Sequence, residues 1–206
     1  MINYDDKKSL LTNNGQNKIG PSMQEFINSV DKIYDINDIK RAYQIFMTTF
    51  HHDKDNQVPK FSRTVEEIVS SKIWSGCSDV GTVFATLLRA NNIPTVYVQT
   101  GNIDWIKELL NDTDKKNFII GHIFLESYIN NKWYLVDPTN GYIYDDYNHS
   151  NLSLPNGYYA FSKSLNGHEV GCDSLQNNSK AMFDHFKNFD LSKYQNPNYQ
   201  VISLKN

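Results

Sequence analysis

The sequence of 206 residues predicts an α+β fold, in which a helical first half is followed by an antiparallel sheet. Three observations predict this class. Apolar residues recur at helical spacing from residue 22 onward, and one helical pattern starts directly after a Gly-Cys dipeptide. Two strand-like runs joined by an Asn-Asn turn follow that helix. The length is sufficient for one domain with a sizeable core.

The first twenty residues are polar and end at Gly20-Pro21, a pair that interrupts regular structure. We expect residues 1–20 to be a flexible N-terminal arm. Residues 21–206 are expected to form a single domain, because no linker rich in Pro, Gly or Ser and no internal repeat divides them.

Three helices are predicted between this arm and the Gly-Cys dipeptide. The first begins at Ser22, which forms a capping-box pattern with Glu25. The second covers residues 36–50, whose apolar side chains fall on one stripe, and the third is a short helix over residues 64–69. The candidates for the cap of the third helix are Ser62 and Thr64.

The stretch of residues 74–81 starts the central helix, which is expected over residues 78–92. Cys77 follows a glycine in this stretch, and apolar residues three or four positions apart follow at once. Ser78 or Asp79 is the expected helix cap. Cys77 therefore lies at the first turn, where free backbone N–H groups and the positive end of the helix dipole favour a thiolate over a thiol.

The second half of the chain is predicted to supply the sheet. A strand is expected over residues 95–100 and a short helix over 104–111. Residues 118–129 and 133–137 form the next two strands, and Asn130-Asn131 suits a hairpin turn because Asn tolerates positive φ. The last elements are a strand over 158–161, a helix over 181–189 and a strand over 199–204.

This hairpin fixes the positions of His122 and Asp137 relative to each other. They lie fifteen residues apart around a two-residue turn, so their side chains share one face of the sheet, directly opposite or one step diagonal. A carboxylate in that place fixes the orientation and tautomer of an imidazole. If the sheet packs this face against the start of the central helix, Cys77, His122 and Asp137 become nucleophile, base and orienting group.

Three motifs resemble those of the transglutaminase-like superfamily, and they occur in the family's order. The nucleophile motif corresponds to Ser75-Gly76-Cys77-Ser78-Asp79. The histidine strand corresponds to Gly121-His122-Ile123-Phe124-Leu125-Glu126. The aspartate strand corresponds to Trp133-Tyr134-Leu135-Val136-Asp137-Pro138-Thr139-Asn140. The resemblance covers the core of the domain, over residues 60–145.

The resemblance implies a papain-like fold in circularly permuted order. Cys77 would attack a peptide or carboxamide carbonyl and form an acyl-thioester, with His122 as general base and acid and Asp137 as its orienting group. The Cys77 backbone N–H is a natural oxyanion donor because it lies at a helix start. The candidates for a second oxyanion donor are Tyr43, Gln44, Gln57 and Trp74.

The resemblance leaves more than one activity open. The cross-linking transglutaminases of animals carry Trp directly after the nucleophile, whereas this chain has Ser78 and is far shorter. We therefore expect a cysteine hydrolase of the peptidase or amidase type, acting on a peptide or protein substrate. The alternatives are acyl transfer to an amine and a non-catalytic binding module of the same fold.

Composition excludes several other classes. The net charge is −3 and no basic stripe is present, so we expect no nucleic-acid partner. No apolar run approaches the ~20 residues of a membrane span, and no leader is evident, so we expect a cytoplasmic protein without a membrane partner. Secretion stays an alternative if a leader has been removed. The sequence does not indicate an oligomeric state.

Neither a cofactor nor a metal is expected. His51, His52 and Asp53 form one cluster of candidate metal ligands, but no second cluster has zinc spacing, so a polar helix end is the preferred interpretation. Cys172 is expected to be a free thiol rather than a disulfide partner of Cys77, because two cysteines are too few for a disulfide scaffold.

Overall fold

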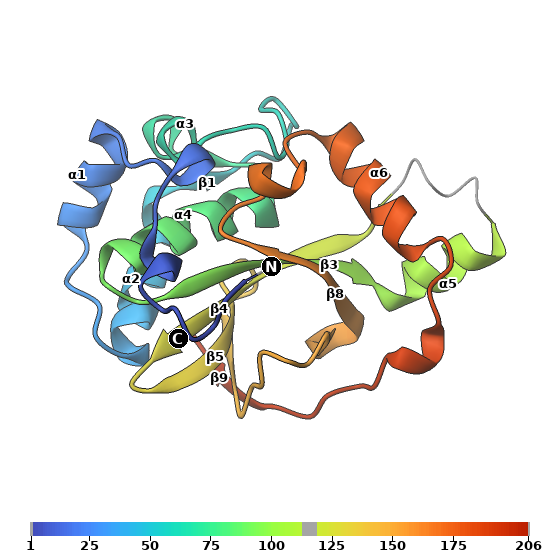
Figure 1. Cartoon of the computed structure of the whole chain (residues 1–206). Coiled ribbons are helices and arrows are strands. Elements are labelled where there is room, and N and C mark those ends of the chain that lie inside the picture. Colours follow the sequence, from blue (N-terminus) through green and yellow to red (C-terminus); the bar gives the residue numbers. More distant parts are fainter. Residues whose placement is uncertain (1, 113–118, 206) are drawn as a thin grey trace.

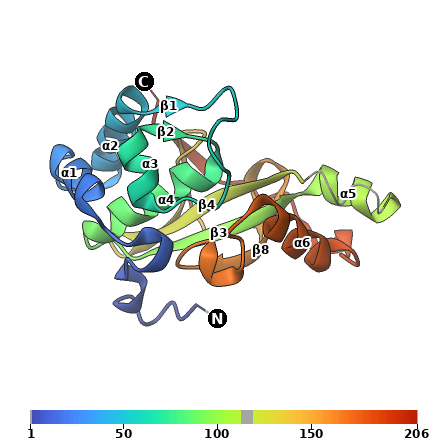
Figure 2. The ribbon, with the colours of Figure 1, turned by 90° about the horizontal axis from the view of Figure 1, so that it is seen from above.

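The computed structural model describes residues 2–112 and 119–205. A seven-stranded sheet with the strand order β7-β8-β3-β4-β5-β6-β9 forms its centre, and all the printed pairs in this sheet are antiparallel. Figures 1 and 2 show α1–α4 at one end of the long strands β3 and β4, and α5 and α6 at the other. The predicted α+β class is confirmed.

The element bounds follow the sequence pattern closely in the central region. The helices are α1 (Pro21–Ser29), α2 (Ile36–Thr49), α3 (Val65–Ser71), α4 (Cys77–Ala90), α5 (Ile103–Asn111) and α6 (Leu175–Phe186). The sheet strands are β3 (Thr95–Asn102), β4 (Gly121–Ile129), β5 (Lys132–Asp137), β6 (Tyr142–Asp145), β7 (Ser153–Leu154), β8 (Tyr158–Ser164) and β9 (Gln200–Ser203). A separate parallel pair, β1 (His51–His52) and β2 (Ile73–Trp74), joins the ends of α2 and α3.

Two of the predicted helix caps are wrong. Ser22 does not cap α1; the Glu66 carboxylate of α3 accepts hydrogen bonds from the Ser22 and Met23 N–H groups, at 2.7 and 3.0 Å. The helix α4 begins at Cys77 behind Gly76 and has no side-chain cap. In α1 a group from elsewhere in the fold has thus replaced local capping. Thr64 does cap α3, in a capping box with Glu67.

The β4–β5 hairpin has the predicted turn. Asn130 and Asn131 both have positive φ, at 49° and 64°, and the strands pair outward from Ile129 and Lys132. β4 begins at Gly121; Phe118, where we expected the strand to start, lies outside the described residues.

The two faces of the sheet pack against different parts of the chain. The helices α1–α4 form one core with a set of side chains that includes Tyr97, Ile123 and Val136. The alternate residues of the same strands, such as Val98 and Phe124, form a second core. His122 belongs by alternation to the face of Phe124, so α4 does not cover the face that carries His122.

Residues 2–20 are packed rather than a flexible arm. Leu10 is 2% exposed and lies in the second core. Asn17 is fully buried, and its amide donates to the Thr82 carbonyl at 3.0 Å. Tyr4 donates its hydroxyl hydrogen to Glu126, a fully buried carboxylate of β4. The segment packs because Leu10 enters the core and because Tyr4 and Asn17 bond buried residues far along the chain.

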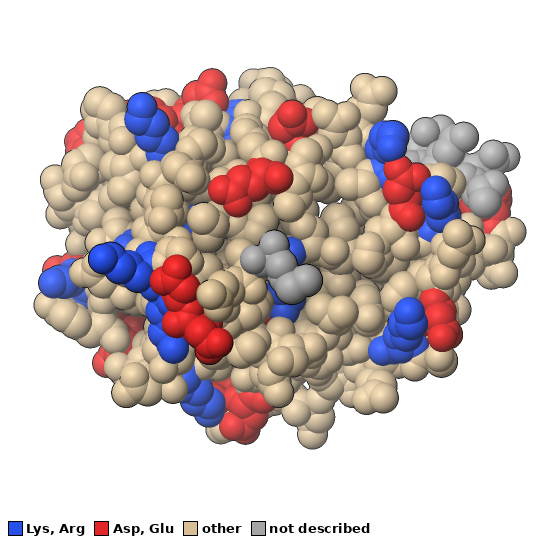
Figure 3. Space-filling model, in the orientation of Figure 1, with Lys and Arg blue, Asp and Glu red and all other residues tan. Residues whose placement is uncertain are grey.

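The described helices include none with the length and apolarity that a bilayer-spanning segment needs. On the face shown in Figure 3, cationic and anionic side chains lie interspersed among many uncharged ones.

Candidate active site

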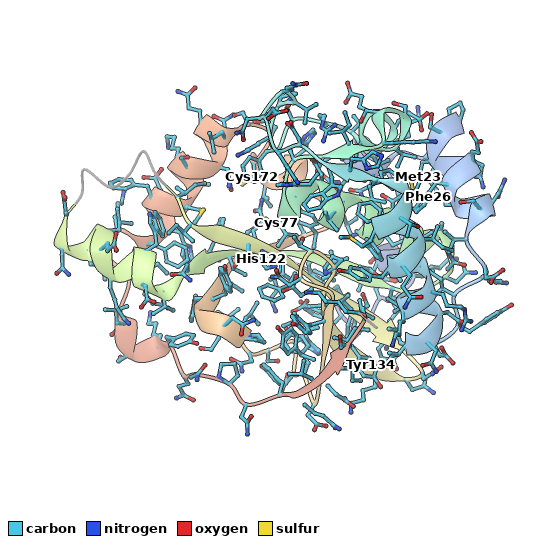
Figure 4. All side chains as sticks on the ribbon, turned by 180° about the vertical axis from the view of Figure 1, so that it is seen from behind. Met23, Phe26, Cys77, His122, Tyr134 and Cys172 are labelled. Carbon is cyan, nitrogen blue, oxygen red and sulfur yellow. The ribbon has the colours of Figure 1, made fainter. Side chains whose placement is uncertain are left out.

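Cys77 is the first residue of α4 and is half-buried. Its backbone N–H has no acceptor within the helix, because the first four N–H groups of a helix lack intrahelical partners. Figure 4 shows Cys77 and His122 next to each other, near the start of α4. Cys77 lies close enough to His122 to contribute to the raised pKa of the imidazole.

His122 and Asp137 meet across the β4–β5 hairpin. The His122 Nε2 atom lies 2.8 Å from the Asp137 Oδ1 atom, and both side chains are buried. Continuing the strand register places Asp137 opposite Phe124, two residues from His122, which is the diagonal arrangement. Because Nε2 is occupied by Asp137, Nδ1 is the ring nitrogen left for Cys77.

The route by which His122 reaches Cys77 differs from the expectation. We expected the His122 face of the sheet to pack on the helix start, whereas α4 packs on the opposite face. The pairing of β4 with β5 ends at Leu125, three residues after His122. The backbone of β4 beside His122 therefore has no partner in the described register of β5, and the ring lies beside Cys77 at the start of α4.

The surroundings of His122 favour its protonated form. Burial alone would lower the pKa of the imidazole, but hydrogen bonds to Asp137 and Cys77 and the charges of both outweigh it. The pKa of His122 is raised to about 10. Nearby groups that accept a hydrogen bond from the protonated ring raise the pKa of an imidazole in this way.

Neighbouring groups hold the imidazole and the carboxylate in place. The Phe124 ring packs edge-on against the imidazole at 4.8 Å between centroids, and the Tyr158 ring lies 5.3 Å away. Asn140 closes around Asp137: its backbone N–H donates to Oδ1 at 3.0 Å and its side-chain amide to Oδ2 at 2.9 Å. The same amide nitrogen lies 3.4 Å from His122 Nε2.

A buried ion pair anchors the loop that leads into Cys77. Asp79 accepts hydrogen bonds from the backbone N–H and the hydroxyl of Ser75, both at 2.7 Å, and it pairs with Arg63. Arg63 also donates to the Ile73 carbonyl at 2.9 Å. Asp79 therefore fixes the backbone before the cysteine. The sequence shows Asp79 at a helix start, but no local signal points to Arg63 as its partner.

Cys77 and His122 line a cavity of about 220 Å³ together with residues of β3, β4, β8 and α6. Among the described residues that line it, none is Tyr43, Gln44, Gln57 or Trp74, the candidates for a second oxyanion donor. Gln99 and Asn178, which no sequence motif singles out, line it instead. Phe61, at its edge, has a left-handed backbone with φ of 68°.

The other candidate residues lie apart from this arrangement. Both cysteines are free, and burial raises the pKa of the Cys172 thiol. His51 and His52 form the short strand β1, and the His52 ring lies against Trp74 at 4.3 Å between centroids. Over residues 2–112 and 119–205, no three His, Cys, Asp or Glu side chains are grouped as a metal site would require.

Comparison with known proteins agrees with this fold. The sequence model of the transglutaminase-like superfamily matches residues 24–138. No curated protein sequence matches the chain at a significant level.

Two solved structures resemble the chain. One is a proposed cysteine protease of Cytophaga hutchinsonii, with 14% identity and a TM-score of 0.54 over 83% of this chain and 50% of that one. The other is described as a TGase, with 12% identity and a TM-score of 0.43 over 90% of this chain and 51% of that one. The chain thus spans about half the length of each. Because the family match covers more than half of the sequence, the chain belongs to the transglutaminase-like superfamily.

Proposed function

We propose that the protein is a cysteine hydrolase that cleaves a peptide or carboxamide bond through an acyl-thioester on Cys77. One observation carries the proposal: the His122 Nε2 atom lies 2.8 Å from the Asp137 Oδ1 atom, and Cys77 lines the same cavity as His122 and lies next to it (Figure 4). A nucleophile, a base and an orienting carboxylate in this order are the requirements of thiol-based acyl transfer.

In the first step, the Cys77 thiolate attacks the carbonyl carbon and a C–S bond forms. The carbonyl oxygen becomes an oxyanion, which the Cys77 N–H at the helix start is placed to stabilise. The tetrahedral intermediate then collapses and the C–N bond breaks. His122, protonated at neutral pH because of its raised pKa, gives its proton to the departing amine.

In the second step, water attacks the thioester and His122 accepts one of its protons. The C–S bond breaks, a carboxylic acid leaves, and the thiolate and the imidazolium are restored. Asp137 keeps the ring in one orientation through both steps, because its two oxygens are themselves held by Asn140. The two steps together consume one water molecule and return Cys77, His122 and Asp137 to their starting states.

Labelling with iodoacetamide at neutral pH tests the activated thiol. Cys77 should react well ahead of Cys172, which is 1% exposed, and His122→Ala should slow the reaction of Cys77. Equal and slow labelling of both thiols would contradict the proposal.

A competition separates hydrolysis from acyl transfer. The acyl-enzyme is formed with an activated peptide ester, and water then competes with a primary amine at modest concentration. Carboxylic acid should be the main product. A product mixture dominated by the amide would instead assign the protein to amine transfer.

A further inference from the structure

Four apolar side chains form one side of the cavity that holds Cys77 and His122. We define them as the α6 wall, because two of them lie on α6 and the others lie next to it in the cavity: Ile119, Phe161, Leu175 and Met182. Among the described lining residues there is no carboxylate, and Lys60 is the one lysine or arginine. The cavity is thus apolar on one side and carries no negatively charged wall.

Two glycines let α6 approach the strand that carries His122. Gly101 of β3 and Gly121 of β4 are direct partners across the sheet. A Cβ atom at Gly121 would lie 3.2 Å from the Met182 Cε atom, and one at Gly101 would lie 2.5 Å from the Phe186 ring. Met182 therefore packs on the residue that precedes His122, which places the α6 wall next to the proposed base.

An irregularity in β8 brings Phe161 into the wall. Gln99 of β3 pairs with Ser162 and Thr100 pairs with Ala160, so Phe161 has no partner on β3. Bulges of this kind change the direction of a side chain and are frequent beside active sites. The Phe161 ring lies in the cavity lining and packs edge-on against Phe186 of α6, at 5.7 Å.

The wall also contains a polar group that points to a peptide. Asn178 lies on α6 between Leu175 and Met182, lines the cavity and is 6% exposed. Its side-chain amide can donate and accept hydrogen bonds, and the main-chain amide of a bound peptide offers the matching donor and acceptor.

We propose that the α6 wall binds a large apolar side chain of a peptide substrate, on the acyl side of the bond that is cleaved. The inference rests on the proposed function and names its substrate class. We assign the wall to the acyl side because a side chain bound there would hold the acyl part through both steps, whereas the amine leaves after the first. A substrate with an acidic or basic side chain in this place would have to leave that charge against an apolar surface.

Peptidyl chloromethyl ketones test this specificity without requiring turnover. Two series, Ac-Ala-X-CH2Cl and Ac-X-Ala-CH2Cl, place X at the first or second residue on the acyl side, with X as Leu, Phe, Gly, Glu or Lys. The rate of Cys77 alkylation is followed by intact mass. In at least one series, Leu or Phe should react about tenfold faster than Gly, Glu or Lys, as burial of a large apolar side chain predicts.

Leu175→Glu provides a matched variant, because Leu175 lies in the wall yet is 52% exposed, so the fold should tolerate the change. It should remove most of the preference for Leu and raise the rate of the Lys reagent relative to the Glu reagent. Leu152→Glu, at a residue that is 41% exposed and outside the cavity lining, should leave all ratios unchanged. Circular dichroism confirms that both variants are folded.

Iodoacetamide, which has no side chain to place, separates the two proposals. Fast labelling of Cys77 by iodoacetamide without any ranking among the peptidyl reagents would overturn the subsite alone. Slow labelling by iodoacetamide would contradict the proposed hydrolase, while the ranking of the peptidyl reagents would still decide the subsite. Asn178→Ala should slow the peptidyl reagents several-fold and leave iodoacetamide unaffected. An equal slowing of both would contradict a peptide-binding role for Asn178.

Discussion

His122 and Asp137 are held together from both sides of their contact. Their Nε2 and Oδ1 atoms lie 2.8 Å apart, and the carboxylate also accepts two hydrogen bonds from Asn140. On the ring side, Phe124 and Tyr158 pack against the imidazole. The orientation of the ring is thus set before any substrate arrives, which is the role that a triad carboxylate performs.

Replacing Asp137 tests this orientation. Asp137→Asn keeps the shape of the side chain but removes its charge, so the rate of Cys77 acylation should fall by about 10²- to 10⁴-fold. The measurement is single-turnover acylation by an activated peptide ester. Asp145→Asn, at a carboxylate of β6 that pairs with Lys132, is the matched control and should leave the rate unchanged. Equal rates in the two variants would remove Asp137 from the mechanism.

The raised pKa of His122 predicts the pH profile. The leaving amine needs the proton of the imidazolium, so kcat/KM should hold through mildly alkaline pH and decline only as the pH rises toward about 10. In Asp137→Asn the alkaline decline should move to lower pH, because the main hydrogen bond that raises this pKa is weakened. If kcat/KM declined over the same alkaline pH range in both proteins, His122 would not be the group whose pKa sets this decline.

The raised pKa of His122 also makes the free energy of unfolding depend on pH. The folded protein holds the His122 proton more tightly than the unfolded chain, whose histidine has a pKa of about 6.5. This contribution is fully present below pH 6.5 and is lost as the pH rises toward about 10. Urea unfolding should therefore show a steeper loss of stability between pH 7 and 10 in the native protein than in His122→Asn. Parallel curves would show that His122 titrates alike in both states.

Asn140 offers a milder test of positioning. Asn140→Ala removes the bond to Asp137 Oδ2 but leaves the backbone bond to Oδ1. We expect kcat to fall by about 10-fold, at the low end of the range for groups that orient a functional side chain, and KM to change little. If kcat falls and its decline at alkaline pH moves away from the native position, Asn140 positions Asp137 and, through it, His122. An unchanged kcat would show that the backbone bond is sufficient.

Arg63 and Asp79 should matter for stability. Arg63→Ala leaves the buried Asp79 carboxylate without its cation, and removing one partner of a buried pair costs about 3–5 kcal/mol in the free energy of unfolding. The Ser75 loop should also become less ordered, so labelling of Cys77 should slow. Lys107→Ala, which breaks an exposed pair with Asp104, should have little effect in the same urea titration.

The sequence predicted those features that depend on neighbours along the chain. Asn130 and Asn131 specify the turn, and the turn fixes the register that brings His122 and Asp137 together. The start of α4 at Cys77 follows from the glycine before it and the apolar spacing after it. These features are local, so the spacing of apolar residues and the alternation of side chains along the hairpin are sufficient to predict them.

The features that the sequence missed depend on contacts between distant residues. Whether α4 covers one face of the sheet or the other is decided by how the whole core packs, and periodicity does not contain that information. The partner of Asp79 and the anchoring of Tyr4 on Glu126 each join residues that are remote in sequence. The helix α6 begins at Leu175, six residues before the expected start, because Ser174 caps it in a stretch of Asn, Gln and Ser without an apolar stripe.

The pairing of Gly101 with Gly121 carries a consequence for how relatives of this protein could diverge. A side chain larger than hydrogen at either position would push against Phe186 or Met182, or against the Thr100 backbone. Such a change would shift α6 and reshape the cleft while Cys77, His122 and Asp137 remained in the sequence. A change of substrate range could thus arise from two inconspicuous glycines, with no change at Cys77, His122 or Asp137.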